Sequence, residues 1–474
     1  MSRVVFQLSA FGEEGATTPL VRLVEPVDDQ ALDRTFDCPA DAAGGDGGGA
    51  ADTPAQDADV NAREGDRLFQ ALAAHEQLGD QLAVALHSAD RRFPVYAEIL
   101  PRSGADSLPW EALRFPGGGP YLALEDKYAL ARVVRTTAPP VPLYQLEPPL
   151  RIMALLSCLG LGAAAELREL RAAALEAGPG MARLLVVVSE EELATSLQAE
   201  VDAGTAPEIA GVHLVPPDHH DLVTLVGEFK PHVLHLFCHG STEPVPHVRL
   251  ALKQDWASAT PGIGLALEKE QFAKFVWDTD GGPWLVVLNC CEGAASSGDG
   301  ATSLARDLVT QGVAPAAVGM REPIRSAVAS TLTQGLYGAL LGELTTRTKA
   351  GATLSAPLDW AALTVAARNR LVTELGAGLS PTQARNQGRE WTLPALYLRW
   401  EEFQLQLTPA RDDGAPRVDP EQARTWRLEV AALQSLLATL PPGQGVAFRA
   451  GATERIAELA ALLGVTPEAL AEPS

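Results

Sequence analysis

The sequence predicts an α/β protein: a mostly parallel sheet flanked by helices on both faces, with a small N-terminal β element and a short helical C-terminal appendage. Three observations predict this class. Short, uninterrupted apolar runs recur in the middle of the chain, as strands covered on both faces require. Alanine- and leucine-rich helical segments separate these runs, and such alternation is typical of a parallel sheet. The chain's 474 residues, 46% hydrophobic and 20% charged, suffice to bury a large core.

The first part of the chain predicts the N-terminal β element and a long loop. Residues 3–10 and 19–25 are rich in apolar and β-branched side chains and predict a hairpin. Between Ala40 and Asp59, 17 of 20 residues are Ala, Gly or Asp, so little is available to pack and we expect a disordered loop. A helical pattern follows at residues 68–86 and a strand pattern at residues 95–100.

Strands and helices then alternate along the chain. Expected strands lie at residues 150–156, 184–188, 212–215, 232–237, 284–288 and 316–319. Expected helices lie at residues 163–177, 221–229, 268–276, 303–310 and 325–344. Ser189 with Glu192 three residues later predicts a capping box that starts a further helix. Residues 391–397 predict an isolated strand, and two helices near 420–440 and 453–463 form the appendage.

Charge and composition exclude several classes of partner. The chain carries 60 acidic and 37 basic residues, a formal net charge of -23, whereas nucleic acids and anionic membranes attract a basic face. Aromatic residues are only 5% of the chain, which argues against a base-stacking surface. No stretch approaches the ~18–20 apolar residues of a membrane-spanning helix. We therefore expect neither direct nucleic-acid binding nor a membrane partner.

Five cysteines indicate a reducing compartment. They form no CxxC pair and are too few for a disulfide framework: Cys38, Cys158, Cys238, Cys290 and Cys291. The first residues also lack the apolar core of a signal peptide. These features predict a cytoplasmic protein without structural disulfides.

Two expected strand ends carry reactive side chains. His239 and Gly240 follow one apolar run, and Cys291 follows another about fifty residues later. Binding crevices of open α/β sheets lie beyond the carboxyl ends of their strands, so adjacent placement would bring His239 and Cys291 together. A thiol beside an imidazole and backbone N–H groups is the arrangement of a cysteine nucleophile. Residues of both types at strand ends can also be purely structural.

The local sequences resemble one peptidase family. VLHLFCHG followed by LVVLNCCEGA is similar to the histidine and cysteine motifs of CHAT-domain peptidases, caspase-like proteases that also resemble separase. Further segments occur in the family's order, and the resemblance spans roughly residues 65–400: Leu108–Leu113, Tyr121–Arg132, Ser303–Leu308, Gly312–Gly319 and Trp391–Tyr397. It implies a caspase-like fold for this region. With the patterns described above, we expect five parts: 1–37 (the β element), 38–61 (the loop), 62–149 (the N-terminal CHAT part), 150–400 (the catalytic part) and 401–474 (the appendage).

The resemblance assigns His239 as general base and Cys291 as nucleophile, with backbone N–H groups of Gly240 and Cys291 for the oxyanion. We expect Cys290 to pack against the sheet. Period-two alternation places His235 on the face of His239, where it is expected to be a core histidine, and Cys238 on the other face. The substrate-binding residues are not indicated, and no cofactor or metal is expected.

The chain departs from the family at residues 321–326, REPIRS, where the family has an aromatic-Pro-Val segment and then an aspartate. The missing carboxylate puts in doubt any third group that orients the histidine. The family's frequent tetratricopeptide repeats are also absent from the sequence.

Two alternatives stay open at this point. A metal site could use His235, Cys238, His239, Cys290 and Cys291, although residues next to each other on a strand face opposite ways. A catalytically idle caspase-like scaffold could instead bind a partner. A nucleotide-binding enzyme has no support, because neither GxGxxG after a strand nor GxxxxGK[ST] occurs.

The resemblance further implies a bacterial regulatory or antiviral defence protease that cleaves a specific protein partner. Residues 292–301, EGAASSGDGA, follow the expected nucleophile and offer no large apolar side chain. We expect this loop to sample several conformations, so that an activating protein or ligand is needed to order the site.

Overall fold

The computed structural model describes residues 4–11, 18–24, 36–37, 59–73, 94–99, 106, 108–115, 117–136, 138–139, 143–242, 245–258, 264–276, 281–290, 303–350, 355–408 and 446–463, with short helical pieces between 426 and 437. The contacts divide the chain into two compact units, Met1–Thr408 and Pro409–Ser474. The predicted loop at residues 40–59 lies outside the described residues, except for Asp59.

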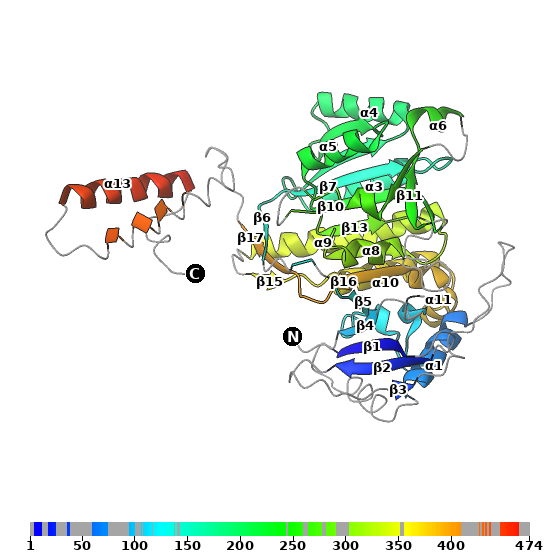
Figure 1. Ribbon diagram of the computed structural model, residues 1–474. Helices are drawn as coiled ribbons and strands as arrows, with labels where there is room; N and C mark the ends of the chain where they lie inside the picture. The colour runs from blue at the N-terminus through cyan, green and yellow to red at the C-terminus, as the bar shows by residue number, and fades with distance from the viewer. Residues whose placement is uncertain are drawn as a thin grey trace. The chain divides into compact units, whose positions relative to one another are not determined.

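Most described strands of the first unit form one sheet (Figure 1). Its order is β3-β2-β1-β4-β5-β16-β14-β13-β10-β7-β8-β9, with β11 and β12 attached through β10. The strands are β1 Val4–Phe11, β2 Thr18–Val24, β3 Phe36–Asp37, β4 Val95–Ile99, β5 Ala131–Val134, β7 Leu150–Ser157, β8 Ala182–Val188, β9 Ile209–Leu214, β10 Val233–Ser241, β11 His247–Leu250, β12 Leu265–Glu268, β13 Leu285–Leu288, β14 Ala316–Met320 and β16 Pro394–Arg399. A small second sheet contains β6 Tyr144–Leu146, β15 Ala356–Pro357 and β17 Gln404–Leu407.

The described helices lie between strands of the first unit, except α13, which belongs to the second unit. They are α1 Val60–Ala73, α3 Ala164–Glu176, α4 Glu191–Asp202, α5 His219–Phe229, α6 Lys253–Ser258, α7 Lys269–Phe272, α8 Leu304–Thr310, α9 Ser326–Lys349, α10 Trp360–Leu375, α11 Pro381–Gln387 and α13 Val446–Leu463, with the 3₁₀ turns η3 Trp110–Ala112, η4 Leu122–Leu124 and η5 Arg389–Thr392. No described helix is long and apolar enough to cross a membrane.

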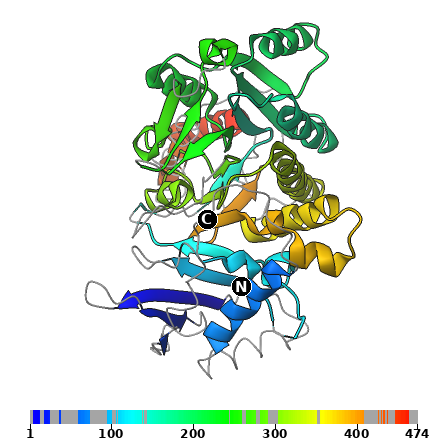
Figure 2. The same cartoon turned by 90° about the vertical axis from the view of Figure 1, so that its right-hand side faces the viewer.

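The sheet has helices on both faces. Helix α9 packs against both α3 and α10, and Figure 2 shows α9 and α10 together on one side of the strands. The strand order reverses after β9, so right-handed crossovers place α5 and α8 on the opposite face. Strands β10, β13 and β14 pair in parallel, and β13 and β14 are buried throughout. The predicted class, a mostly parallel sheet between helices, is confirmed.

Several element predictions were accurate, including the N-terminal hairpin, which is formed by β1 and β2. Two were wrong. Ser189 does not cap α4, whose N-cap is Glu190. Ser189 directly follows β8 and is buried there, and its hydroxyl donates to the carbonyl of Ala251 at 2.6 Å. The strand expected near residues 391–397 is not isolated, since β16 lies between β14 and β5 in the main sheet. It joins β14 antiparallel, a long-range pairing that local sequence does not encode.

A buried ion-pair cluster connects η3 to the sheet. The Arg132 guanidinium, on β5, donates to both carboxylate oxygens of Glu111 at 3.0 and 2.8 Å, and both side chains are fully buried. Arg132 also donates to the Asp106 carboxylate at 3.2 Å, and the Tyr397 hydroxyl donates to that carboxylate at 2.6 Å. Burial alone would raise the pKa of Glu111, but the charge and hydrogen bonds of Arg132 lower it overall. The cluster therefore holds an ionised pair inside the core.

The second unit contains a small core of its own. Val430, Ile456 and Leu459 are buried together, and α13 covers the second of the two helices predicted for the appendage.

Candidate active site

Strands β10 and β13 carry the region of the predicted dyad. They pair in parallel, with Val233 opposite Leu285 and Leu236 opposite Leu288. Beyond this ladder the backbone N–H of Asn289 donates to the carbonyl of Leu236 at 2.9 Å. The predicted adjacency of the two strands is confirmed. Because their carboxyl ends meet at one edge of the sheet, this edge is where a site is expected.

The sequence predicted that His239 follows its strand. In the structure His239 lies within β10. The strand continues to Ser241 because a hairpin partner extends it: His239 lies opposite Arg249 and Ser241 opposite His247 of β11. Residues 233–238 of β10 are buried, including Cys238, and exposure begins at His239. The imidazole is therefore accessible from solvent at the edge of the sheet.

A tight turn after β7 supplies a hydrogen-bond acceptor for His239. The N–H of Leu161 donates to the carbonyl of Cys158 at 2.9 Å, and Gly160 has a φ of 81°, the left-handed region that favours glycine. The turn places the carbonyl oxygen of Leu159 2.8 Å from Nε2 of His239. A carbonyl can only accept, so Nε2 carries the proton. In the neutral imidazole, Nδ1 is then the basic nitrogen.

Cys158 also contacts this imidazole. Its Sγ lies 3.6 Å from Nε2 of His239, and the residue is only 4% exposed. Because Nε2 is already protonated when it donates to Leu159, it cannot take the proton of this thiol. Sequence analysis missed the contact, since only the pairing of β7 with β10 brings these residues together.

Other residues singled out in the sequence occupy the positions expected of core residues. His235 is fully buried, and its Nε2 lies 3.0 Å from the Glu166 carboxylate, which confirms it as a core histidine. Cys290 and Cys238 are each 2% exposed, and Cys290 belongs to the main hydrophobic core as predicted. Gly240 follows His239 in β10 and lies opposite β11.

Cys291 and residues 292–301 lie outside the described residues. The assignment of Cys291 as nucleophile and the oxyanion donors therefore stay predictions. Within the described part of the chain, no three His, Cys, Asp or Glu side chains converge as a metal site. Among the five residues that the sequence offered as zinc ligands, His235 instead forms a hydrogen bond with the Glu166 carboxylate.

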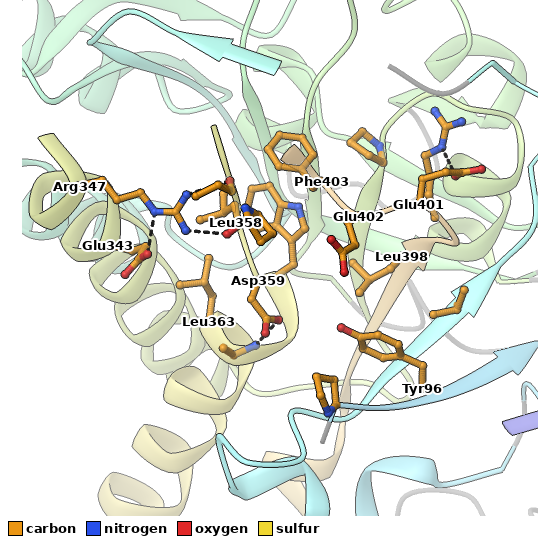
Figure 3. A pocket seen from close by; sticks show the side chains of 18 residues that line it. Tyr96, Glu343, Arg347, Leu358, Asp359, Leu363, Leu398, Glu401, Glu402 and Phe403 are labelled. Carbon is orange, nitrogen blue, oxygen red and sulfur yellow. Dashed lines mark hydrogen bonds and ion pairs between the residues drawn. The ribbon is translucent and has the colours of Figure 1, made fainter. Parts of the chain in front are cut away.

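A cavity of about 430 Å³ lies elsewhere on the same unit (Figure 3). In this view the side chains of Asp359, Glu402 and Tyr96 face a common space. The lining includes Pro315, which directly precedes β14, so the cavity lies at the amino-terminal edge of the parallel strands. His239 lies near the carboxyl end of β10, at the opposite edge of these parallel strands.

The family comparison agrees with this geometry. The model of the CHAT domain matches residues 62–371, more than half of the chain. The chain belongs to the CHAT-domain family. This is a family of caspase-like cysteine peptidases. The fold described above is the α/β architecture that membership implies.

Two solved structures of the Saccharomyces cerevisiae separase–securin complex are also similar to the CHAT-domain chain. The TM-scores are 0.35 and 0.34, with 13% sequence identity in each case. The matches cover 72% and 71% of this chain but only 18% and 17% of those chains. No curated protein matches.

The segment that departs from the CHAT family pattern is held by ion pairs. The Arg389 guanidinium donates to the carboxylate of Glu322, with Nε 2.9 Å from Oε2, and Arg325 donates to Glu390 at 2.6 Å. These contacts connect the segment before α9 to η5. The described group that orients the His239 imidazole is a backbone carbonyl, that of Leu159, so the chain has an orienting partner without the missing carboxylate.

Proposed function

We propose that this CHAT-domain protein is a cysteine endopeptidase in which His239 is the general base and Cys291 the nucleophile. The observation that carries the proposal is the His239 imidazole, which is exposed, oriented by Leu159, and located on the strand beside the one that leads to Cys291. Leu236 and Leu288 are paired, and His239 and Cys291 each follow by three residues.

The chemistry follows from this arrangement. The thiol proton of Cys291 passes to Nδ1 of His239 as the sulfur attacks the carbonyl carbon of the scissile bond. Backbone N–H groups of Gly240 and Cys291 stabilise the oxyanion. The imidazolium then protonates the leaving amine as the C–N bond breaks, and the same imidazole activates the water that hydrolyses the acyl-enzyme. The hydrogen bond from Nε2 to Leu159 holds the ring and stabilises the imidazolium throughout.

Thiol reagents and chelators provide the direct test. We expect iodoacetamide to abolish peptide hydrolysis through alkylation of Cys291, because the thiolate is the attacking group. We expect EDTA to leave hydrolysis unchanged. Peptide mapping by mass spectrometry identifies the alkylated residue, and a fluorogenic peptide library reports turnover.

Two results would contradict the proposal. Loss of turnover with EDTA and its recovery with zinc would favour the metal alternative. Absence of turnover on every peptide and protein tested, with Cys291 no more reactive than Cys158 or Cys290, would favour the idle scaffold.

We further propose that the substrate is a specific protein and that an activating protein or ligand orders the site. The support is the composition of residues 292–301, which follow Cys291 and offer no large apolar side chain. If the competent form has a population of about 1%, the activator must favour it by roughly 2.7 kcal/mol to reach parity.

The corresponding prediction concerns the purified chain alone. We expect its turnover to be low and to rise by at least about tenfold when the proteins encoded beside its gene are added. Steady-state kinetics on one peptide substrate, with and without those proteins, measures the effect. Full activity of the isolated chain, unchanged by any addition, would contradict partner activation without affecting the assignment of the dyad.

A further inference from the structure

A buried carboxylate between β10 and the end of β13 takes no part in the proposed chemistry. Glu166, in the first turn of α3, is fully buried and faces four donors from three different elements. They are Nε2 of His235 at 3.0 Å, Nδ2 of Asn289 at 2.7 Å, the Ser330 hydroxyl at 3.0 Å and the Thr333 hydroxyl. Three of the donors reach Oε1 and the Ser330 hydroxyl reaches Oε2, so both oxygens of the ionised carboxylate accept hydrogen bonds.

The charge state of Glu166 agrees with this geometry. Burial raises the pKa of its carboxyl, but the hydrogen bonds and charge of His235, with those of Thr333 and Asn289, lower it overall. Burying a charge is costly unless it is paired and hydrogen-bonded, so the contacts with His235, Thr333 and Asn289 favour the ionised form of Glu166.

Glu166 connects the two strand ends of the proposed site. Its helix begins directly after the turn that contains Leu159, the acceptor for His239. Its Oε1 accepts from Asn289, which follows β13 and precedes Cys291 by two residues. The Asn289 amide also donates to the carbonyl of Ala329 in α9 at 3.0 Å. The Glu166 carboxylate therefore connects the Leu159 turn, which orients His239, to Asn289, which precedes Cys291.

We propose that Glu166 is a positioning residue, which sets the distance between His239 and Cys291 by holding Asn289 relative to the Leu159 turn. This role rests on the proposed function. Reacting groups need alignment within a fraction of an ångström, and a displacement of about 1 Å can cost about 100-fold in rate. The effect therefore falls on kcat and on the reactivity of the thiolate, and not on substrate binding.

The test replaces Glu166 with glutamine. Glu166→Gln keeps the size of the side chain, but its amide NH₂ faces a donor and its charge is lost. We expect kcat to fall by about 10- to 100-fold, with KM changed by less than about twofold. The pH profile of Cys291 alkylation by iodoacetamide, read by mass spectrometry, should move towards that of an unpaired thiol.

Glu208→Gln is the matched control. Glu208 is 5% exposed and accepts from Arg171 of α3 at 2.7 Å, but it lies at the start of β9, far along the sheet from β13. We expect this variant to lose stability and to keep kcat within about twofold. If Glu166→Gln does not fold, Asn289→Ala interrupts the same connection from its other end and should give the same loss of kcat.

The outcomes separate the two proposals. Wild-type kcat and an unchanged alkylation profile in folded Glu166→Gln would overturn the positioning role while leaving the dyad intact. An equal loss of kcat in Glu208→Gln would show that general destabilisation causes the loss, and would also overturn the positioning role of Glu166. Alkylation of wild-type protein at a residue other than Cys291 would overturn the proposed function, and the positioning role with it.

Discussion

Replacing Cys291 with alanine is expected to abolish peptide hydrolysis while the protein stays folded. The proposed mechanism has no other nucleophile, so kcat should fall by about 1,000-fold or more. His239→Ala should have an effect of similar size, because Nδ1 takes the thiol proton in the first step and returns it to the leaving amine. Steady-state kinetics on a peptide that the wild type cleaves, with circular dichroism as a check of folding, measures both variants.

Cys290→Ala is the control for this experiment. Cys290 is adjacent in sequence and 2% exposed, so the change removes a small packed side chain and should leave most of the activity. If Cys290→Ala were inactive and Cys291→Ala active, the nucleophile would be misassigned by one residue. Loss of activity in Cys158→Ala with retention in Cys291→Ala would instead point to the Cys158 thiol, whose Sγ lies 3.6 Å from Nε2 of His239.

The second large effect is expected at the buried ion pair. Arg132→Met should lower the free energy of unfolding by about 3 kcal/mol, because it removes both hydrogen bonds to the buried Glu111 carboxylate and leaves Arg321, 3.9 Å away, as its remaining ion-pair partner. Chemical denaturation of both proteins measures the difference. Arg132→Met combined with Glu111→Leu should recover part of the loss, since the buried Glu111 carboxylate that lost its two hydrogen bonds is then gone.

An exposed ion pair is the control for burial. Lys253 and Glu191 are 2.6 Å apart, with side chains 49% and 59% exposed, and Lys253→Ala should cost less than about 1 kcal/mol. A similar cost at both sites would show that burial does not govern the contribution of these pairs.

The same pair has a pH signature. The folded-state pKa of Glu111 lies below its ordinary value of 4.5, so the unfolded chain binds the proton more readily. The pair's contribution to stability is therefore complete above about pH 4.5 and is lost as the pH falls through the folded-state pKa. Arg132→Met should flatten this acid limb of the stability curve.

The buried pair also explains two of the segments that identified the family. Glu111 belongs to the LPWEAL segment and Arg132 ends the segment that begins at Tyr121. In the sequence they are separate, weak signals. In the structure they form one ion pair, which connects the two segments.

Sequence patterns alone predicted the helices and strands around the site because their cause is local. Uninterrupted apolar runs predicted β7, β8, β13 and β14, and His239 is exposed directly after the apolar run at residues 233–238 of β10. The adjacency of β10 and β13 was also predictable, since the connection between them can form a crossover in a parallel sheet.

Other features were decided only by the tertiary structure. The Leu159 carbonyl that orients His239 is a backbone atom, and no residue type marks it except the neighbouring Gly160, whose positive φ closes the turn. Glu166 was not recognised, although an acid on the apolar stripe that also carries Leu170 was a readable signal. Its donors come from β10, the end of β13 and α9, up to 167 residues away in the chain.

The division has one physical cause. Hydrophobic periodicity reports how each segment is buried, so the sequence by itself determined the α/β class, the strands of the site and the two residue types at their ends. Hydrogen bonds between distant segments depend on which strands become neighbours and in which register. Only the tertiary structure therefore decided that Leu159 supports the imidazole and that Glu166 joins the two strand ends beneath it.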